Sequence, residues 1–122
     1  MAALRIAFEA PDSPGNSPAT GRKPIDFAHL AVQTMGDKAL EIEVLQLFAR
    51  QARQVMKEIV EGEGIHRAQA AHRLKGAALA VGAVDVAQAA GAIEQNPTEA
   101  SLSDTLSTAV LEAELFILKL CR

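Results

Sequence analysis

Apolar residues recur at alternating spacings of three and four in two long stretches of the chain, as they do along the buried face of an amphipathic helix. The pattern predicts one helix that follows Asp37 as its N-cap and reaches about Val60, and another from about Thr98 to Leu120. The first stripe contains Leu45, Phe48, Ala52, Val55 and Ile59, and the second contains Leu102, Leu106, Ala109, Ala113, Phe116 and Leu120. We expect both stripes to face a shared core.

Helix-breaking residues divide the rest of the chain into three further helices. Pro24 and Asp26 precede a short helix that we expect from about Phe27 to Met35. Two longer helices should cover about residues 65–81 and 83–95. The breaks between the predicted helices fall at Gly36, at Gly62 and Gly64, at Gly82, and at the pair Asn96-Pro97.

Four long segments with short connections predict an all-α fold. Because such helices pack as antiparallel neighbours, we expect an antiparallel up-down-up-down four-helix bundle over residues 24–122, with a short extra N-terminal helix. Residues 1–23 are predicted to be a flexible N-terminal arm, since residues 10–24 hold four of the five prolines. The apolar run Leu4–Phe8 leaves three interpretations open: a disordered tail, docking on the bundle, or strand pairing with a partner.

The composition agrees with packed helices and narrows the range of partners. Hydrophobic residues make up 49% of the chain but aromatic residues only 3%, whereas strands favour aromatic and β-branched residues. A net charge of −3 argues against nucleic-acid binding, and no run of about 18 apolar residues predicts a membrane span. The single cysteine, Cys121, can form no internal disulfide and has no companions for a metal site. We expect a cytoplasmic protein.

The predicted helix over residues 65–81 has two different faces when its residues are placed at about 100° intervals. One side is apolar and consists of Ala70, Leu74, Ala77, Ala78 and Val81. The opposite side holds His72, Lys75, Gly76 and Leu79, with Ala68 and Gln69 one turn earlier. We therefore expect the imidazole of His72 to face water rather than the core.

The residues around His72 suit phosphoryl chemistry. A solvent-facing histidine is largely neutral at cellular pH, and neutral imidazole is a nucleophile that can attack a phosphoryl group. Lys75, one turn away, can supply a cation to the phosphoryl oxygens. Gly76 leaves space beside the imidazole, although a glycine inside a helix costs about 1 kcal/mol relative to alanine. Clearance for a docking partner is one reason for such a glycine.

The segment HRLKGAALAVG resembles the motif of histidine-containing phosphotransfer (HPt) domains. It joins His72, Lys75 and Gly76 to a run of small residues and a second glycine, Gly82. The resemblance spans about residues 24–120. Outside the motif it rests on Leu47-Phe48 upstream and on Val86-Ala87, Ala90 and Ile93-Glu94 downstream.

This resemblance implies that His72 accepts the phosphoryl group, that Lys75 stabilises it and that Gly76 admits the partner. It implies a two-component phosphorelay in which the chain takes the group from one receiver-domain aspartate and passes it to another. The partners would be response-regulator receiver domains and a sensor histidine kinase of the hybrid type. The receiver would hold Mg²⁺, and the chain itself would need no cofactor.

We predict that Ala68, Gln69 and Leu79 form the partner-binding surface around His72. Leu79 departs from the family, which has a smaller residue there, and it would enlarge the apolar rim. His29 and His66 lack the companions of His72 and are expected to be ordinary surface residues. The charged residues of the helix before Val60 are interpreted as its solvated face, with the rim of the docking surface as the alternative; they are Glu41, Glu43, Arg50, Arg53 and Lys57.

Three alternatives stand beside the carrier hypothesis. The chain could bind receivers without carrying phosphate, or it could be the phospho-accepting domain of a chemotaxis-type kinase. A dimeric histidine-kinase core fits less well, because such cores reach four helices only by dimerisation and this chain has four of its own; we expect a monomer. The sequence contains no P-loop and no kinase glycine-rich loop, which predicts a carrier without its own ATP site rather than an enzyme.

Overall fold

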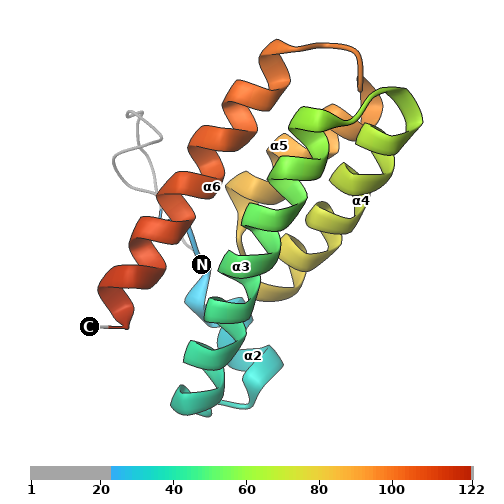
Figure 1. The fold of residues 1–122 in the computed structure, drawn as a ribbon. Coiled ribbons are helices and arrows are strands. Elements are labelled where there is room, and N and C mark those ends of the chain that lie inside the picture. Colours follow the sequence, from blue (N-terminus) through green and yellow to red (C-terminus); the bar gives the residue numbers. More distant parts are fainter. Residues whose placement is uncertain (1–22, 122) are drawn as a thin grey trace, which may run out of the picture.

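The structure is a computed structural model that describes residues 23–121. The predicted arm therefore lies outside the described residues, apart from Lys23. The described chain forms five α-helices and no strand, in agreement with the all-α prediction. In the numbering of Figure 1 they are α2 (Phe27–Thr34), α3 (Lys38–Glu61), α4 (Gly64–Val81), α5 (Val84–Gln95) and α6 (Ser101–Leu120).

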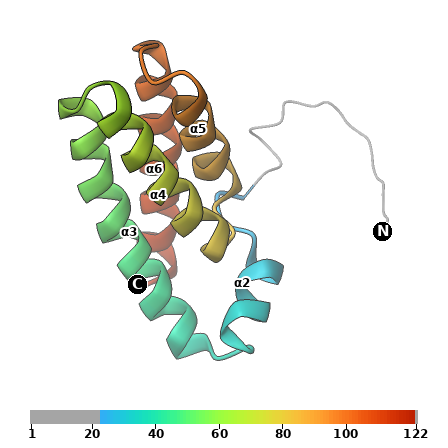
Figure 2. The ribbon, with the colours of Figure 1, turned by 90° about the vertical axis from the view of Figure 1, so that its right-hand side faces the viewer.

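Four of these helices surround one core. Helix α3 packs against α4 and α6, and α5 packs against the same two helices, so that the four form a closed ring. Figures 1 and 2 show the chain reversing its direction at each connection between them. The short helix α2 packs against α3 and α4 at one end of the ring. This arrangement leaves α4 and α6 at opposite corners.

The predicted stripe of α3 is buried along its whole length, from Leu45 to Ile59. The stripe of α6 was only partly correct. Val110 and Ile117 are buried although the prediction omitted them, whereas Leu120 is exposed. The reason is that α6 contacts both α3 and α5, and a helix held between two neighbours buries a wider arc than a single stripe.

The start of α6 also differs from the prediction. The helix begins at Ser101 rather than near Thr98. The backbone N–H of Glu99 donates to the carbonyl of Asn96 at 3.1 Å, which forms a turn in the residues that follow α5. Because this turn includes Thr98 and Glu99, α6 begins only after it.

Two polar residues near α2 are less exposed than the sequence predicts. Glu41 was interpreted as part of a solvated face, but it is only 5% exposed because α2 packs against this end of α3. Its carboxylate accepts a hydrogen bond from the Thr34 hydroxyl at 3.4 Å and pairs with the Lys38 ammonium at 3.5 Å. His29 on α2 is half-buried rather than an ordinary surface residue, whereas His66 is exposed as predicted.

The turn between α4 and α5 is attached to the start of α2. The backbone N–H of Asp26 donates to the carbonyl of Gly82 at 2.8 Å. Gly82 has φ of +79°, and a Cβ placed there would lie 2.7 Å from the carbonyl oxygen of Asp26. Only glycine fits both the left-handed backbone and the close contact. The second glycine of the motif therefore fixes the end of α4.

Along residues 23–121, every helix is too short or too polar to cross a membrane.

Candidate functional site

His72 lies on the outer side of α4. Its side chain is 67% exposed, while Ala70, Leu74 and Ala78 on the other side of the helix are buried. The two-faced pattern of α4 therefore predicted the orientation of this histidine correctly. An exposed imidazole can be approached by a second protein without any change in the bundle.

Glu94 reaches the imidazole from the neighbouring helix α5. Its Oε2 lies 2.7 Å from Nδ1 of His72, and its Oε1 lies 2.8 Å from Nζ of Lys75. One carboxylate of α5 thus contacts both His72 and Lys75 of α4. The sequence predicted His72 and Lys75 on one face of a helix, but it did not predict this bridge.

The charges of the cluster determine which ring nitrogen is free. The Lys75 ammonium, and after it the His72 imidazole, lower the pKa of the Glu94 carboxyl, so that Glu94 is ionised at neutral pH. An ionised carboxylate can only accept hydrogen bonds, and Nδ1 must therefore be the donor. The neutral ring then carries its lone pair on Nε2. Nε2 is therefore the ring nitrogen that is available to act as a nucleophile.

The aliphatic stem of Lys75 also contacts α5, in addition to the ion pair between its ammonium and Glu94. Its side chain is only 34% exposed, and its Cδ lies 3.5 Å from where a Cβ at Gly91 would stand. The aliphatic stem of Lys75 therefore lies beside Gly91 on the surface of α5. A lysine held in this way keeps its ammonium within one helical turn of the imidazole.

Gly76, unlike Gly82, is not confined by neighbouring atoms. A Cβ placed at Gly76 would meet no atom within 4 Å, and the residue is exposed. Packing within the chain therefore does not require this glycine. The space that it leaves one turn from His72 opens outward, as expected of a position that admits a partner.

The predicted docking residues also lie on α4. Gln69 and Leu79 are exposed, Leu79 by 55%, whereas Ala68 is half-buried. Next to His72, Arg73 forms an ion pair with Glu58 of α3 across the groove between the two helices. The surface around the imidazole is thus apolar at Leu79 and charged at Arg73. No group of three or more His, Cys, Asp or Glu within residues 23–121 could hold a metal ion.

Glu94 is the residue of the candidate site that sequence analysis missed. It was noted only as a helix-end residue within the family resemblance. A usable signal was nevertheless present, because His72 and Glu94 lie about equally far from the turn at residues 82–83. In a helical hairpin, positions equidistant from the turn lie side by side. A carboxylate at that distance could have been paired with the histidine.

Comparison with known proteins agrees with this geometry. The family model described as Hpt domain matches residues 43–115, a range that contains His72, Lys75, Gly76 and Glu94. Searches of curated proteins and of solved structures found no match. The matched range covers more than half of the chain and most of its helical ring. The chain therefore belongs to the Hpt domain family, the phosphotransfer modules of two-component signalling.

Proposed function

We propose that this protein is a histidine phosphotransfer protein of a two-component phosphorelay, which carries a phosphoryl group on Nε2 of His72 between receiver-domain aspartates. One observation carries the proposal: an exposed imidazole whose Nδ1 is held by the ionised carboxylate of Glu94. The same contact orients the ring and leaves Nε2 free to react. The antiparallel up-down-up-down bundle supplies the rigid frame for this contact.

The transfer step follows from these contacts. The lone pair on Nε2 attacks the phosphorus of the receiver's aspartyl phosphate, an N–P bond forms, and the P–O bond to the aspartate breaks. The aspartate leaves as a carboxylate, so no proton has to be transferred. The imidazole ring keeps its proton on Nδ1 and becomes positively charged, and Glu94 at 2.7 Å stabilises that charge. Passage to the next receiver is the reverse of this step.

Lys75 stabilises the phosphoryl group in this proposal. Its ammonium pairs with Glu94 at 2.8 Å in the absence of phosphate. Three phosphoryl oxygens beside it carry more negative charge than one carboxylate shared with an imidazole. We therefore infer that Lys75 turns from Glu94 toward the phosphoryl group as the N–P bond forms. Phosphoryl transfer depends mainly on such positioning and charge stabilisation.

The partner completes the site. Gly76 leaves space for the receiver, and Ala68, Gln69 and Leu79 provide its docking surface on α4. In this proposal the receiver holds Mg²⁺, and a sensor kinase of the hybrid type supplies phosphate to the relay from ATP in the cytoplasm. The chain itself carries the group and hydrolyses no nucleotide.

Transfer from a radiolabelled phospho-receiver tests this function. The host's receivers are loaded with a small phosphodonor and mixed with wild-type protein, with His72→Gln and with His66→Gln. His66 is the matched control because it is an exposed histidine on the same helix. Wild type and His66→Gln should gain an acid-labile label, and His72→Gln should gain none. Labelling of His72→Gln would refute the proposal.

The same assay separates the alternatives. If isolated kinase catalytic domains with ATP label the chain directly but no receiver does, the chain is the phospho-accepting domain of a chemotaxis-type kinase. If receivers bind wild type and His72→Ala equally and transfer no label, it is a docking module. Either result would replace the phosphorelay function.

A further inference from the structure

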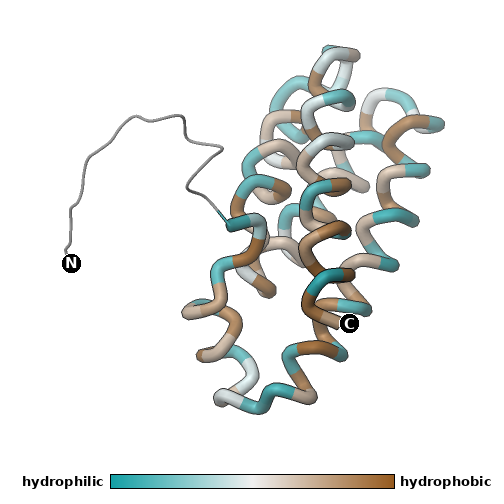
Figure 3. Tube along the Cα trace, turned by 90° about the vertical axis from the view of Figure 1, so that its left-hand side faces the viewer, coloured by the Kyte–Doolittle hydropathy of each residue, from teal (hydrophilic) through white to brown (hydrophobic). Residues whose placement is uncertain are grey.

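Helix α6 presents a second apolar surface on its outer side. Leu111, Leu115 and Leu118 follow spacings of four and three, and they are 54%, 50% and 60% exposed. At about 100° per residue they lie opposite the buried residues Ala109, Ala113 and Ile117. Figure 3 shows hydrophobic positions recurring along the C-terminal half of this helix. Single exposed leucines are ordinary, but a contiguous stripe indicates an interaction surface.

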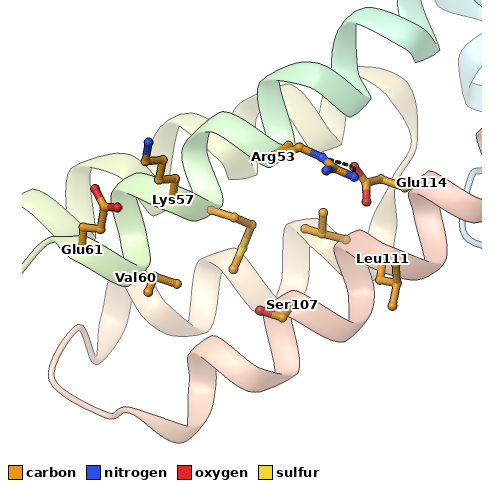
Figure 4. Close-up of a pocket in the computed structure, with 9 residues that line it drawn as sticks. Arg53, Lys57, Val60, Glu61, Ser107, Leu111 and Glu114 are labelled. Carbon is orange, nitrogen blue, oxygen red and sulfur yellow. Dashed lines mark hydrogen bonds and ion pairs between the residues drawn. The ribbon is translucent and has the colours of Figure 1, made fainter.

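Two grooves run beside this leucine stripe, between α3 and α6. One has a volume of about 360 Å³ and is lined by Met56, Val60 and Leu111 among others. Figure 4 shows this groove, with the Arg53–Glu114 ion pair of 2.9 Å joining the two helices at one end. The other, of about 400 Å³, is lined by all three leucines of the stripe. The surface therefore offers both projecting side chains and hollows that can receive them.

Two charged residues beside the leucine stripe indicate which partner would fit it. Glu112 and Lys119 lie on the same flank, two turns apart, and neither forms an ion pair with another described residue. Within α6 each has only uncharged residues three and four positions away, so the helix itself does not neutralise them. Two copies of α6 in antiparallel contact would bring Glu112 of each copy toward Lys119 of the other. Parallel contact would instead place this flank of the two copies on opposite sides of the interface, where Glu112 and Lys119 could not meet.

We propose that the outer face of α6 is a homodimer interface, in which two copies pack antiparallel about a two-fold axis. The leucine stripe forms its centre, and two reciprocal Glu112–Lys119 pairs fix its register. Such a surface is self-complementary, as an isologous interface must be. This proposal departs from the monomer expected from the sequence. Each subunit is already a complete bundle, so the dimer differs from histidine-kinase cores that need two chains to form four helices.

The dimer leaves the proposed phosphotransfer site free. His72 lies on the outer side of α4, and α4 and α6 occupy opposite corners of the ring. Each copy therefore presents its imidazole away from the two-fold axis. The inference does not rest on the proposed function, because self-association and labelling of His72 are measured separately.

Sedimentation equilibrium over about 5 to 500 µM of the 122-residue chain tests the interface. Wild type should reach about twice the chain mass of 12.9 kDa. Leu115→Glu should remain monomeric across this range. Leu47→Glu is the matched control because Leu47 is equally exposed, at 50%, but lies on α3; this variant should dimerise like wild type. Far-UV circular dichroism checks that each variant keeps its helices.

Charge exchange distinguishes this interface from any other use of the leucines. Glu112→Lys and Lys119→Glu should each raise the dimer dissociation constant at least about tenfold, because like charges then face each other across the axis. The double variant should return it close to the wild-type value. A monomeric wild type, a dimer that persists in Leu115→Glu, or a double variant no better than the single ones would overturn the proposal.

Discussion

Glu94 divides its carboxylate between two side chains of another helix, with Oε2 on His72 and Oε1 on Lys75. His72, Lys75 and Gly76 could be predicted from the sequence because they share one helix, and helical periodicity determines which residues share a face. Glu94 lies on α5, and periodicity within α4 contains no information about contacts between helices. The shared face of His72, Lys75 and Gly76 was therefore predictable from periodicity, whereas the contact with Glu94 could be inferred only from its distance to the turn between α4 and α5.

Replacing Glu94 by glutamine should slow phosphoryl transfer on the order of 10- to 100-fold while leaving His72 as the labelled residue. Glutamine can still accept a hydrogen bond from Nδ1, but it has no charge to stabilise the phosphorylated ring. The measurement is the initial rate of label transfer from a phospho-receiver. Transfer at the wild-type rate would show that the charge of Glu94 does not stabilise the phosphorylated ring.

The pH dependence of stability provides an independent check of the same contact. Because its partners lower the pKa of Glu94, its contribution to stability is present above the usual carboxyl pKa and is lost as the pH falls through the lowered value. The unfolding midpoints of wild type and Glu94→Gln should therefore differ at pH 7 and converge as the pH falls below the usual carboxyl pKa. A difference in unfolding midpoint that does not change with pH would contradict a stabilising contact between ionised Glu94 and its two partners.

The helices themselves follow from local signals, which explains why most of their boundaries could be predicted. Asp26 accepts hydrogen bonds from Ala28 and His29, and Asp37 accepts one from Leu40, so both are the N-caps that their positions in the sequence predict. The burial of Glu41 was not predictable in this way. It depends on where α2 packs, and that packing depends on the contact between Asp26 and Gly82, which are far apart in the sequence.

Substituting alanine for each of the two glycines of the motif, Gly76 and Gly82, should change the free energy of unfolding in opposite directions. Gly82→Ala should lower the free energy of unfolding by about 1–3 kcal/mol or more, because it combines a positive φ with a Cβ placed 2.7 Å from the Asp26 carbonyl. Gly76→Ala should raise it by about 1 kcal/mol, since the new methyl meets nothing and alanine favours helix. Urea unfolding followed by circular dichroism measures both. Equal effects would contradict this division between structural and functional glycines.

In the molecule as a whole, the buried core and the exposed His72 lie on opposite sides of α4. Each helix of the ring contributes buried residues to one cluster, so the described chain should unfold as a unit. The four-helix composition of this core could be predicted from apolar spacing. The precise buried arc of α6 could not, because it depends on which two neighbours the helix has.

Leu74→Ala tests this separation. Leu74 is only 1% exposed, and its loss should lower the free energy of unfolding by about 2–5 kcal/mol. Because Leu74 points away from His72 on the same helix, the rate of label transfer should stay within about twofold of wild type at temperatures where the variant remains folded. A larger loss of transfer in the folded variant would show that the site depends on the core beneath it.

The exposure of the His72 side chain has a consequence for the lifetime of a phosphoryl group on Nε2. The His72 side chain is 67% exposed, so a phosphoryl group on Nε2 would stand in water without cover from residues 23–121. The lifetime of that group would then be set by the intrinsic lability of the phosphoramidate. In the proposed relay, a phosphoryl group that no receiver takes up would be lost by hydrolysis, so the abundance of receivers would determine how much of the signal survives.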